Sequence, residues 1–313
     1  MTFPLRRRAG AAAITLAAAL ALAACSGESD DPVPASEQSP STSASGSKGP
    51  SPSSEPTAEP TEPSGSASPT ASGTAVPVYF AGDGPGGKPR LFREFQRVDG
   101  DPLTEAARIV AGGGEPVDPD YRTLWPQVEI SAVSATDGVL LVEIPSDAFT
   151  ERPDGMTRRD ARLAVQQLVL TLQGVQQERV PVLISREGGL PLFGLPTDSP
   201  FQAASALRTL NLVNITSPAE GDSVSGDTLT VTGVANSFEA SGPCRLLVGG
   251  DEVALEGYQS EGWMEDRLFP FEVDLPLDGI TGEVVVQCET DDPSGGAEGN
   301  GPSIDTKTIT VAD

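Results

Sequence analysis

The last third of the chain consists of seven short apolar runs separated by turn residues, and no stretch of it keeps the 3.6-residue period of a helix. Gly, Pro, Asp and Ser cluster between the runs, as they do where strands reverse direction. Several short strands with turn signals at this spacing predict an all-β sandwich. The expected strands are Leu212–Thr216, Leu229–Ala235, Cys244–Val248, Glu252–Glu256, Phe269–Leu275, Glu283–Thr290 and Thr306–Val311.

The preceding segment, residues 75–197, mixes strand and helix patterns and predicts an α+β domain. Asp101 and Pro102 have the residue types of an N-cap and a first helical position. Thr157–Asp160 has the pattern of a capping box, and the helix after it has apolar residues at three- and four-residue spacing up to Gly174, where we expect it to end. The expected strands are Val76–Phe80, Arg90–Val98, Val128–Val133, Gly138–Pro145 and Val180–Ile184.

The first residues have the pattern of an export signal. Arg6–Arg8 form the basic region and Ala9–Ala24 the apolar region, which is shorter than the ~20 residues that cross a bilayer. Leu22–Cys25 resembles the bacterial lipobox, so we expect residues 1–24 to be a lipoprotein signal peptide and Cys25 to carry diacylglycerol and palmitate-like acyl groups. An ordinary signal that leaves a free thiol is the alternative, and Sec and twin-arginine export both stay open. The expected location is the outer face of the cell membrane.

Residues 26–73 consist almost wholly of Ser, Pro, Thr, Glu, Ala and Gly. Such a segment buries too little apolar surface to offset the entropy of ordering, so we expect residues 25–74 to be a disordered tether. A tether of this kind would hold the folded part away from the membrane.

Cys244 and Cys288 are expected to form a disulfide. Cys244 alternates with Leu246 and Val248, and Cys288 alternates with Val284 and Val286, so both sulfurs should point toward the core. An exported compartment permits oxidation. Two buried free thiols are the alternative, because buried cysteines also behave as small apolar side chains.

The chain carries 45 Asp and Glu against 20 Lys and Arg, a formal net charge of −25, and contains no histidine. The negative charge opposes binding to nucleic acid. The missing histidine excludes Ser-His-Asp and Cys-His catalysis and removes the usual nitrogen ligand of zinc, copper and haem, so no cofactor or metal is expected. The charge is uneven, because residues 213–313 have 20 acidic and 3 basic residues, whereas residues 75–197 have 17 and 12.

Two groups of motifs resemble known domain families. Gln167–Gln173 ("QLVLTLQ"), together with the order of the surrounding strands, is similar to the GerMN domain, named for sporulation and spore germination. Val231–Ala240 ("VTGVANSFEA") and Phe269–Leu277 ("FPFEVDLPL") resemble the immunoglobulin-like domain of bacterial spore germination.

The resemblance implies a GerMN-like α+β domain over residues 75–197, a connector over 198–212 and an immunoglobulin-like β-sandwich over 213–313. It also implies a cell-envelope lipoprotein without known catalysis. Relatives of the GerMN fold resemble ring-building modules of sporulation channels, and actinobacterial lipoproteins use GerMN domains near a sensor kinase. The families have no agreed catalytic or ligand residues, so none is assigned.

Three local patterns need a choice between a site and an ordinary surface. Gly82–Lys88 imitates a phosphate-binding loop, but Pro89 stands where Ser or Thr is required, so a loop between strands is favoured. Arg158, Arg159 and Arg162 are either a solvated face or a docking patch for an acidic partner. Two sets of acidic residues predict a solvated rim, with a calcium site as the alternative; they are Asp291, Asp292, Glu298, Asn300 and Asp305, and Glu261, Glu265 and Asp266.

These observations predict a non-enzymatic, membrane-anchored scaffold or protein-interaction module of the cell envelope, linked to sporulation, germination or envelope signalling. Its expected partners are envelope proteins or a second copy of the chain. The alternative is a cell-wall glycan or calcium binding module, although Trp125 and Trp263 are the only tryptophans available as glycan platforms. A hydrolase is the least favoured class, because histidine is missing.

Overall fold

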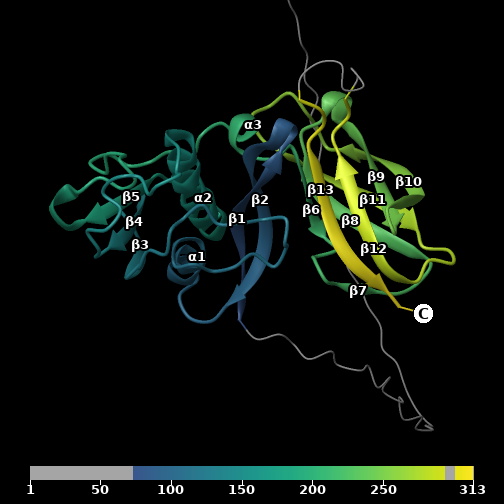
Figure 1. The fold of residues 1–313 in the computed structure, drawn as a ribbon, viewed down its shortest axis with the longest axis horizontal. Helices are drawn as coiled ribbons and strands as arrows, with labels where there is room; N and C mark the ends of the chain where they lie inside the picture. Colours follow the sequence, from purple (N-terminus) through teal and green to yellow (C-terminus); the bar gives the residue numbers. More distant parts are fainter. Residues whose placement is uncertain (1–72, 293–299, 313) are drawn as a thin grey trace, which may run out of the picture. The chain divides into compact units, whose positions relative to one another are not determined.

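The computed structural model describes residues 73–292 and 300–312. The expected signal peptide, Cys25 and the expected tether as far as residue 72 lie outside these residues. Within the described ranges an α+β part is followed by an all-β part (Figure 1), which confirms the expected fold class. No helix among the described residues is long and apolar enough to cross a membrane.

A long antiparallel hairpin begins the α+β part. Strands β1 (Thr74–Gly84) and β2 (Lys88–Val98) pair along their whole length. The turn Pro85–Gly87 joins them, with Gly86 and Gly87 at φ values of 66° and 68°, a conformation that glycine adopts without strain. The glycine-rich segment is therefore a loop between strands, and no helix begins there to bind a phosphate.

Helices α1 (Pro102–Ala111) and α2 (Arg158–Gln176) pack against each other and against β1. The Asp101 side chain accepts a hydrogen bond from the Thr104 backbone N–H at 2.9 Å, and Thr157 and Asp160 form the expected capping box. The sequence predicts that α2 ends at Gly174, but the helix continues to Gln176. A Cβ at position 174 would lie 2.7 Å from Cγ of Pro77, so this glycine permits close packing on β1 instead of ending the helix.

A second small sheet contains β3 (Ala132–Thr136), β4 (Val139–Ile144) and β5 (Val182–Arg186) in that order. The first two strands form an antiparallel hairpin, and β5 lies parallel to β4 after the crossover through α2. The strand expected from Val128 begins only at Ala132. Val128 is buried, but its backbone N–H donates to Ala111 at the end of α1 instead of to a strand.

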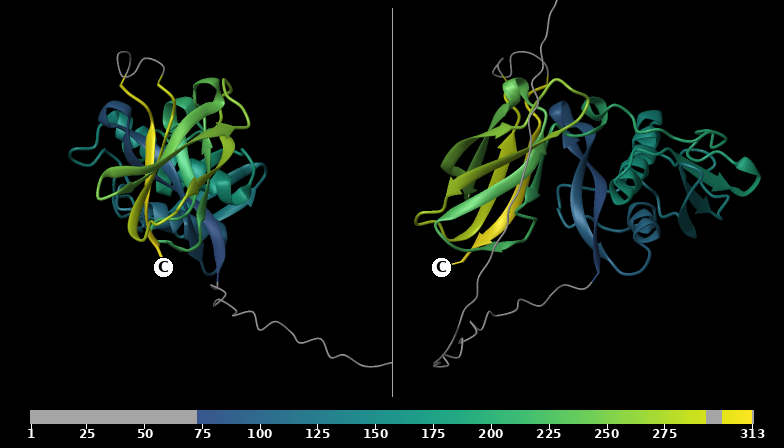
Figure 2. Two further views of the ribbon diagram at one scale, coloured as in Figure 1. Left: turned by 90° about the vertical axis from the view of Figure 1, so that its right-hand side faces the viewer. Right: turned by 180° about the vertical axis from the view of Figure 1, so that it is seen from behind.

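The all-β part is one sheet of eight strands in the order β6-β8-β11-β10-β9-β12-β13-β7, and its curl is visible in both views of Figure 2. Seven strands correspond to the seven expected runs: β6 (Val213–Ser217), β8 (Thr228–Ala235), β9 (Ser241–Val248), β10 (Asp251–Ser260), β11 (Phe269–Pro276), β12 (Gly282–Glu289) and β13 (Ile304–Val311). The eighth, β7 (Ser223–Val224), is too short to leave a pattern in the sequence.

Strand β10 connects the two halves of the curled sheet. It pairs with β9 over most of its length and with β11 only through Gln259 and Ser260. The bulge between Glu252 and Ala254 adds to the local twist. A single curled sheet thereby encloses the apolar core that two separate sheets enclose in an ordinary sandwich.

The predicted disulfide between Cys244 and Cys288 is present. The two cysteines lie opposite each other on the neighbouring strands β9 and β12, with 4.1 Å between their Cα atoms, and both side chains are fully buried. In antibody domains the corresponding bridge connects two sheets. Here it links neighbouring strands inside the curled sheet.

The disulfide should contribute strongly to stability. Because it closes a loop of 44 residues, we expect the Cys244→Ala/Cys288→Ala variant to lose about 4 kcal/mol of the free energy of unfolding. Denaturant unfolding with and without reductant measures this loss. Reductant should lower the midpoint of the wild type toward that of the variant and leave the variant unchanged; a wild-type midpoint that complete reduction does not move would contradict the prediction.

Candidate functional site

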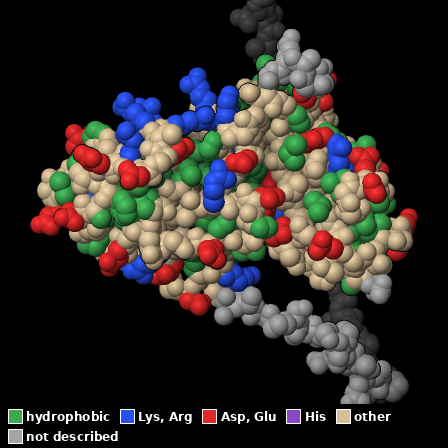
Figure 3. All heavy atoms as spheres, in the orientation of Figure 1, with side chains coloured by type: hydrophobic (Ala, Val, Ile, Leu, Met, Phe, Trp, Pro, Cys, Tyr) green, Lys and Arg blue, Asp and Glu red, His purple; other side chains and the backbone are tan. Residues whose placement is uncertain are grey.

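The three arginines that the sequence singles out are exposed at the start of α2. Arg158 and Arg162 are one helical turn apart and lie on one side of the helix. Arg159 lies near Arg90, whose pKa is lowered by burial and by the positive charge of Arg159. None of the three helix arginines forms an ion pair with another described residue. We call Arg90, Arg158, Arg159 and Arg162 the arginine patch, and Figure 3 shows Lys and Arg side chains (blue) gathered near α2.

The acidic residues of the sandwich do not form one group. Asp266 accepts hydrogen bonds from Ser205 Oγ at 2.9 Å and from the Leu207 backbone N–H at 3.0 Å, at the start of the short helix α3 (Ala206–Thr209). The expectation that Asp305 belongs to a solvated rim is wrong, because this side chain is 3% exposed. Glu298 lies outside the described residues. In the described ranges, no three or more His, Cys, Asp or Glu side chains are grouped so that they could hold a metal ion.

Asp305 belongs to a buried group of polar side chains that joins the α+β part to the sandwich. Lys307 of β13 donates through Nζ to the Asp118 carboxylate and, at 2.7 Å, to the Tyr121 hydroxyl. The Tyr121 hydroxyl donates to Asp305 Oδ1 at 2.6 Å, and Asp305 Oδ2 accepts from the Ile215 backbone N–H at 2.6 Å. We call Asp118, Tyr121, Asp305 and Lys307 the buried charge cluster; each is at most 6% exposed.

Burial and charge raise the pKa values of Tyr121, Asp305 and Lys307. Burial, aided by the negative charges of Asp305 and Asp118, raises the pKa of Tyr121 well above its ordinary value. Burial also raises the pKa of Asp305, against the opposing effect of Lys307. Burial would lower the pKa of Lys307, but the carboxylates of Asp305 and Asp118 outweigh it, so the lysine pKa is raised. Lys307 therefore remains an ammonium ion at neutral pH.

The cluster has the residue types of an active site, but the pKa of its lysine is shifted in the direction opposite to the one that catalysis needs. A lysine acts as a nucleophile or a base only when its pKa is lowered, and here it is raised. The arrangement instead fixes the position of β13 against the loop that carries Asp118 and Tyr121.

The sequence analysis missed Lys307, although the chain contains a signal for it. Asp305, Lys307, Ile309 and Val311 alternate along β13, and all four are buried. A charged pair that continues an apolar face at a period of two predicts side chains buried against a partner. The partner lies 186 residues away for Tyr121 and 189 for Asp118, so the sequence does not identify it.

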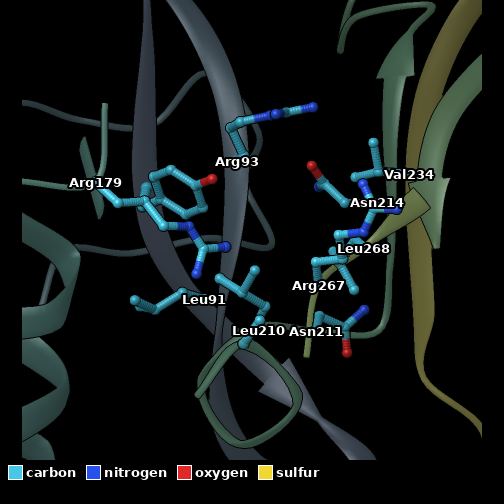
Figure 4. A pocket seen from close by; sticks show the side chains of 11 residues that line it. Leu91, Arg93, Arg179, Leu210, Asn211, Asn214, Val234, Arg267 and Leu268 are labelled. Atoms are coloured by element: carbon cyan, nitrogen blue, oxygen red, sulfur yellow. The ribbon is translucent and has the colours of Figure 1, made fainter. Parts of the chain in front are cut away.

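Next to the cluster lies a cavity of about 170 Å³. Figure 4 shows Leu91, Arg93 and Arg179 on one side of it and Asn214, Arg267 and Leu268 on the other. Asn214 belongs to both features, because its Nδ2 donates to Asp305 Oδ2 at 3.2 Å. We call this cavity the arginine pocket.

The curled sheet with its buried disulfide defines the all-β part as an immunoglobulin-like module. Residues 212–297 match the family model described as "Immunoglobulin-like domain of bacterial spore germination". This match confirms the expected resemblance of the sandwich, and the family description names no catalytic activity.

Two solved structures show weaker similarity. The tandem GerMN domains of the sporulation protein GerM from Bacillus subtilis are 15% identical over 65% of this chain and 61% of that chain, with a TM-score of 0.33. A crystal structure of an engineered protein is 19% identical over 37% of this chain and 22% of that chain, with a TM-score of 0.27. The chain covers less than two thirds of either structure.

The first of these structures carries the family name that the sequence motifs suggest for the α+β part. Neither TM-score is high enough to carry an argument, so the architecture of this part rests on the elements described above. A comparison with curated proteins gave no match.

We expect removal of the buried ammonium group to uncouple the two parts of the described chain. Lys307→Met leaves the Asp118 and Asp305 carboxylates buried without a counter-charge, which should cost about 3–5 kcal/mol of the free energy of unfolding. Scanning calorimetry should then show two unfolding transitions in place of one. The matched control is Lys88→Met, which removes an exposed lysine; a single, unshifted transition in the Lys307 variant would refute the assigned role.

The same cluster predicts a loss of stability at alkaline pH. The pKa values of Tyr121 and Lys307 are raised by folding, so their contribution is fully present below their unfolded values of about 10 and 10.4 and is lost as pH rises through the folded values. Thermal unfolding of wild type should therefore weaken steeply above about pH 10. The Tyr121→Phe/Lys307→Met variant should show a smaller alkaline slope than wild type, and equal slopes would contradict the prediction.

Proposed function

We propose that this chain is a non-enzymatic scaffold or protein-interaction lipoprotein, held by a lipid on Cys25 at the outer face of the cell membrane. The observation that carries the scaffold role is the buried charge cluster, because it joins the α+β part and the sandwich through side chains whose polar groups are hydrogen-bonded to one another. The link to spore germination rests on the family matched by residues 212–297.

The Cys244–Cys288 disulfide indicates an extracytoplasmic location, since disulfides persist in oxidising compartments. The membrane anchor is the finer part of the proposal and rests on the lipobox-like Leu22–Cys25. A lipid anchor and a long polar segment before residue 75 would place the folded part outside the cell within reach of envelope proteins.

The arginine patch is the surface that we propose for docking. Its three helix arginines are exposed, no member is neutralised by an ion pair among the described residues, and the chain as a whole has a net charge of −25. An acidic partner would be attracted to the patch. Residues 213–313 of a second copy, with 20 acidic against 3 basic residues, have the charge that such a partner needs.

The anchor predicts acyl groups on the N-terminal peptide. Intact mass of protein extracted from native membranes should show cleavage before Cys25 and the added mass of acyl chains. The Cys25→Ala variant should remain unprocessed and carry no acyl groups. Alkaline washing should release this variant from the membrane fraction, whereas the lipidated wild type should stay in it. Processing and retention equal to wild type would exclude the lipid anchor.

The docking patch predicts a salt-sensitive association. Arg158→Glu/Arg162→Glu should weaken self-association or capture of the envelope partner, mainly through a slower association rate, because charge steers the encounter. Sedimentation of the purified full chain at low and high salt tests the second copy, and cross-linking in native membranes tests an envelope partner. The matched control is Lys88→Glu/Arg97→Glu, which makes the same charge change at exposed positions of β2; equal binding by both variants would refute the patch.

One observation favours the alternative of a glycan-binding module. Phe238 and Trp263 form an edge-to-face pair with 5.2 Å between ring centroids, and Phe238 is 44% exposed. Aromatic rings of this kind can support a sugar ring. Trp263→Ala should abolish retention on purified cell-wall glycan if this function is the correct one, whereas the scaffold proposal expects no retention by the wild type.

A further inference from the structure

The arginine pocket gathers positive charge in a strongly acidic protein. Arg93, Arg179 and Arg267 line it, and its lining contains no acidic side chain among the described residues. Arg179 forms no hydrogen bond or ion pair with another described residue, although its charge adds to the effect of the hydrogen bonds that lower the pKa of Asp266, and Arg267 pairs with Glu265 through Nε at 2.9 Å. Guanidinium groups that share one cavity repel each other unless an anion binds between them.

Beside the pocket lie buried polar atoms that have neither a protein partner nor accessible surface of their own. Oδ1 of Asn211 and Oδ1 of Asn214 accept no hydrogen bond from a described residue, and the two side chains are 1% and 3% exposed. Nε of Arg93 is likewise buried and unpaired. Native proteins rarely leave such groups unsatisfied, because each costs free energy.

The orientation of the two amides is fixed by their nitrogen atoms. Asn211 Nδ2 donates to the carbonyl groups of Val213 and Ile304, both at 2.9 Å, and Asn214 Nδ2 donates to Asp305. An exchange of oxygen and nitrogen would break these bonds, so the unpaired atoms are acceptors. A ligand in the pocket does not reach these oxygens, so the guanidinium groups and the apolar lining define its chemistry: an anionic group on a small apolar body.

We propose that the arginine pocket binds the carboxylate of an N-acylated amino acid, equivalent to the last residue of a peptide. The carboxylate would lie between the guanidinium groups, and the small side chain would rest on Leu91 and Leu268. An engineered cavity of about 150 Å³ holds one benzene molecule, so the volume suits a ligand of this size. Inorganic phosphate has the charge but no apolar body to rest on these leucines.

This site goes beyond the proposed scaffold function and connects to the buried charge cluster. Asn214 lines the pocket and bonds to Asp305, and Arg93 Nη2 donates to Thr216 Oγ1 of β6 at 3.2 Å. The walls of the pocket thus come from both the α+β part and the sandwich. A ligand that bridges these walls stabilises their contact and should raise the temperature of unfolding.

Isothermal titration calorimetry on the full chain tests the proposal with four probes. N-acetylalanine should bind, N-acetylalanine amide should bind at least about tenfold more weakly because it lacks the charge, and inorganic phosphate should also bind weakly. Trialanine with a free carboxyl end separates the two sources of this chemistry. If it binds more tightly than N-acetylalanine the natural ligand is a peptide end, and if it is excluded the ligand is a free small molecule.

Arg179→Gln should weaken binding of N-acetylalanine about tenfold or more. Arg97→Gln removes the same charge at an exposed position of β2 outside the pocket and should bind like wild type. Asn211 and Asn214 side-chain amide signals in NMR spectra of the wild type should shift on binding, which needs no variant.

Three results would overturn the proposal: no heat and no shift at millimolar N-acetylalanine, which would leave the pocket to water; equal binding of phosphate and N-acetylalanine; or equal loss in the two arginine variants.

Discussion

The buried ammonium group of Lys307 determines how the two folded parts of the chain meet. An ammonium group away from water needs counter-charges and acceptors, and Asp118, Asp305 and the Tyr121 hydroxyl supply them. Asp305 lies on the same strand as the lysine, whereas Asp118 and Tyr121 belong to the α+β part. In any other arrangement of the two parts Lys307 would lose Asp118 and Tyr121 and keep only Asp305 of its own strand, so this network favours the observed arrangement.

Two of the three basic residues of the sandwich lie at its junction with the α+β part. Residues 213–313 contain Arg245, Arg267 and Lys307 as their only basic residues. Arg245 pairs with Glu252 and Glu289 within the sheet, and the other two face the α+β part, one in the cluster and one in the arginine pocket. The contact between the sandwich and the α+β part thus places an excess of guanidinium groups around one cavity.

The local elements could be predicted because their patterns are local. Alternation placed Cys244 and Cys288 on inward faces, and the capping box of Thr157 and Asp160 marked the start of α2. The errors arose where distant packing overrode a local rule. Helix α2 does not end at Gly174, because the missing side chain there serves close packing against Pro77. Val128 stays outside the sheet because its backbone N–H donates to a carbonyl group at the end of α1. The arginines of α2 could be named as exposed, but the addition of Arg90 to their patch required the fold.

The sequence by itself determined the seven long strands of the sandwich, the two long helices, the disulfide, and the exclusion of histidine-dependent chemistry, because periodicity and composition act within a few residues. The tertiary structure alone decided that Asp118 and Tyr121 are the partners of Asp305 and Lys307, and that Arg93, Arg179 and Arg267 surround one cavity. Lys307 lies 189 residues from Asp118 and 186 from Tyr121 in the sequence. Their burial depends on opposite charges that meet only after both parts have folded, and no local pattern records which distant residue will supply the counter-charge.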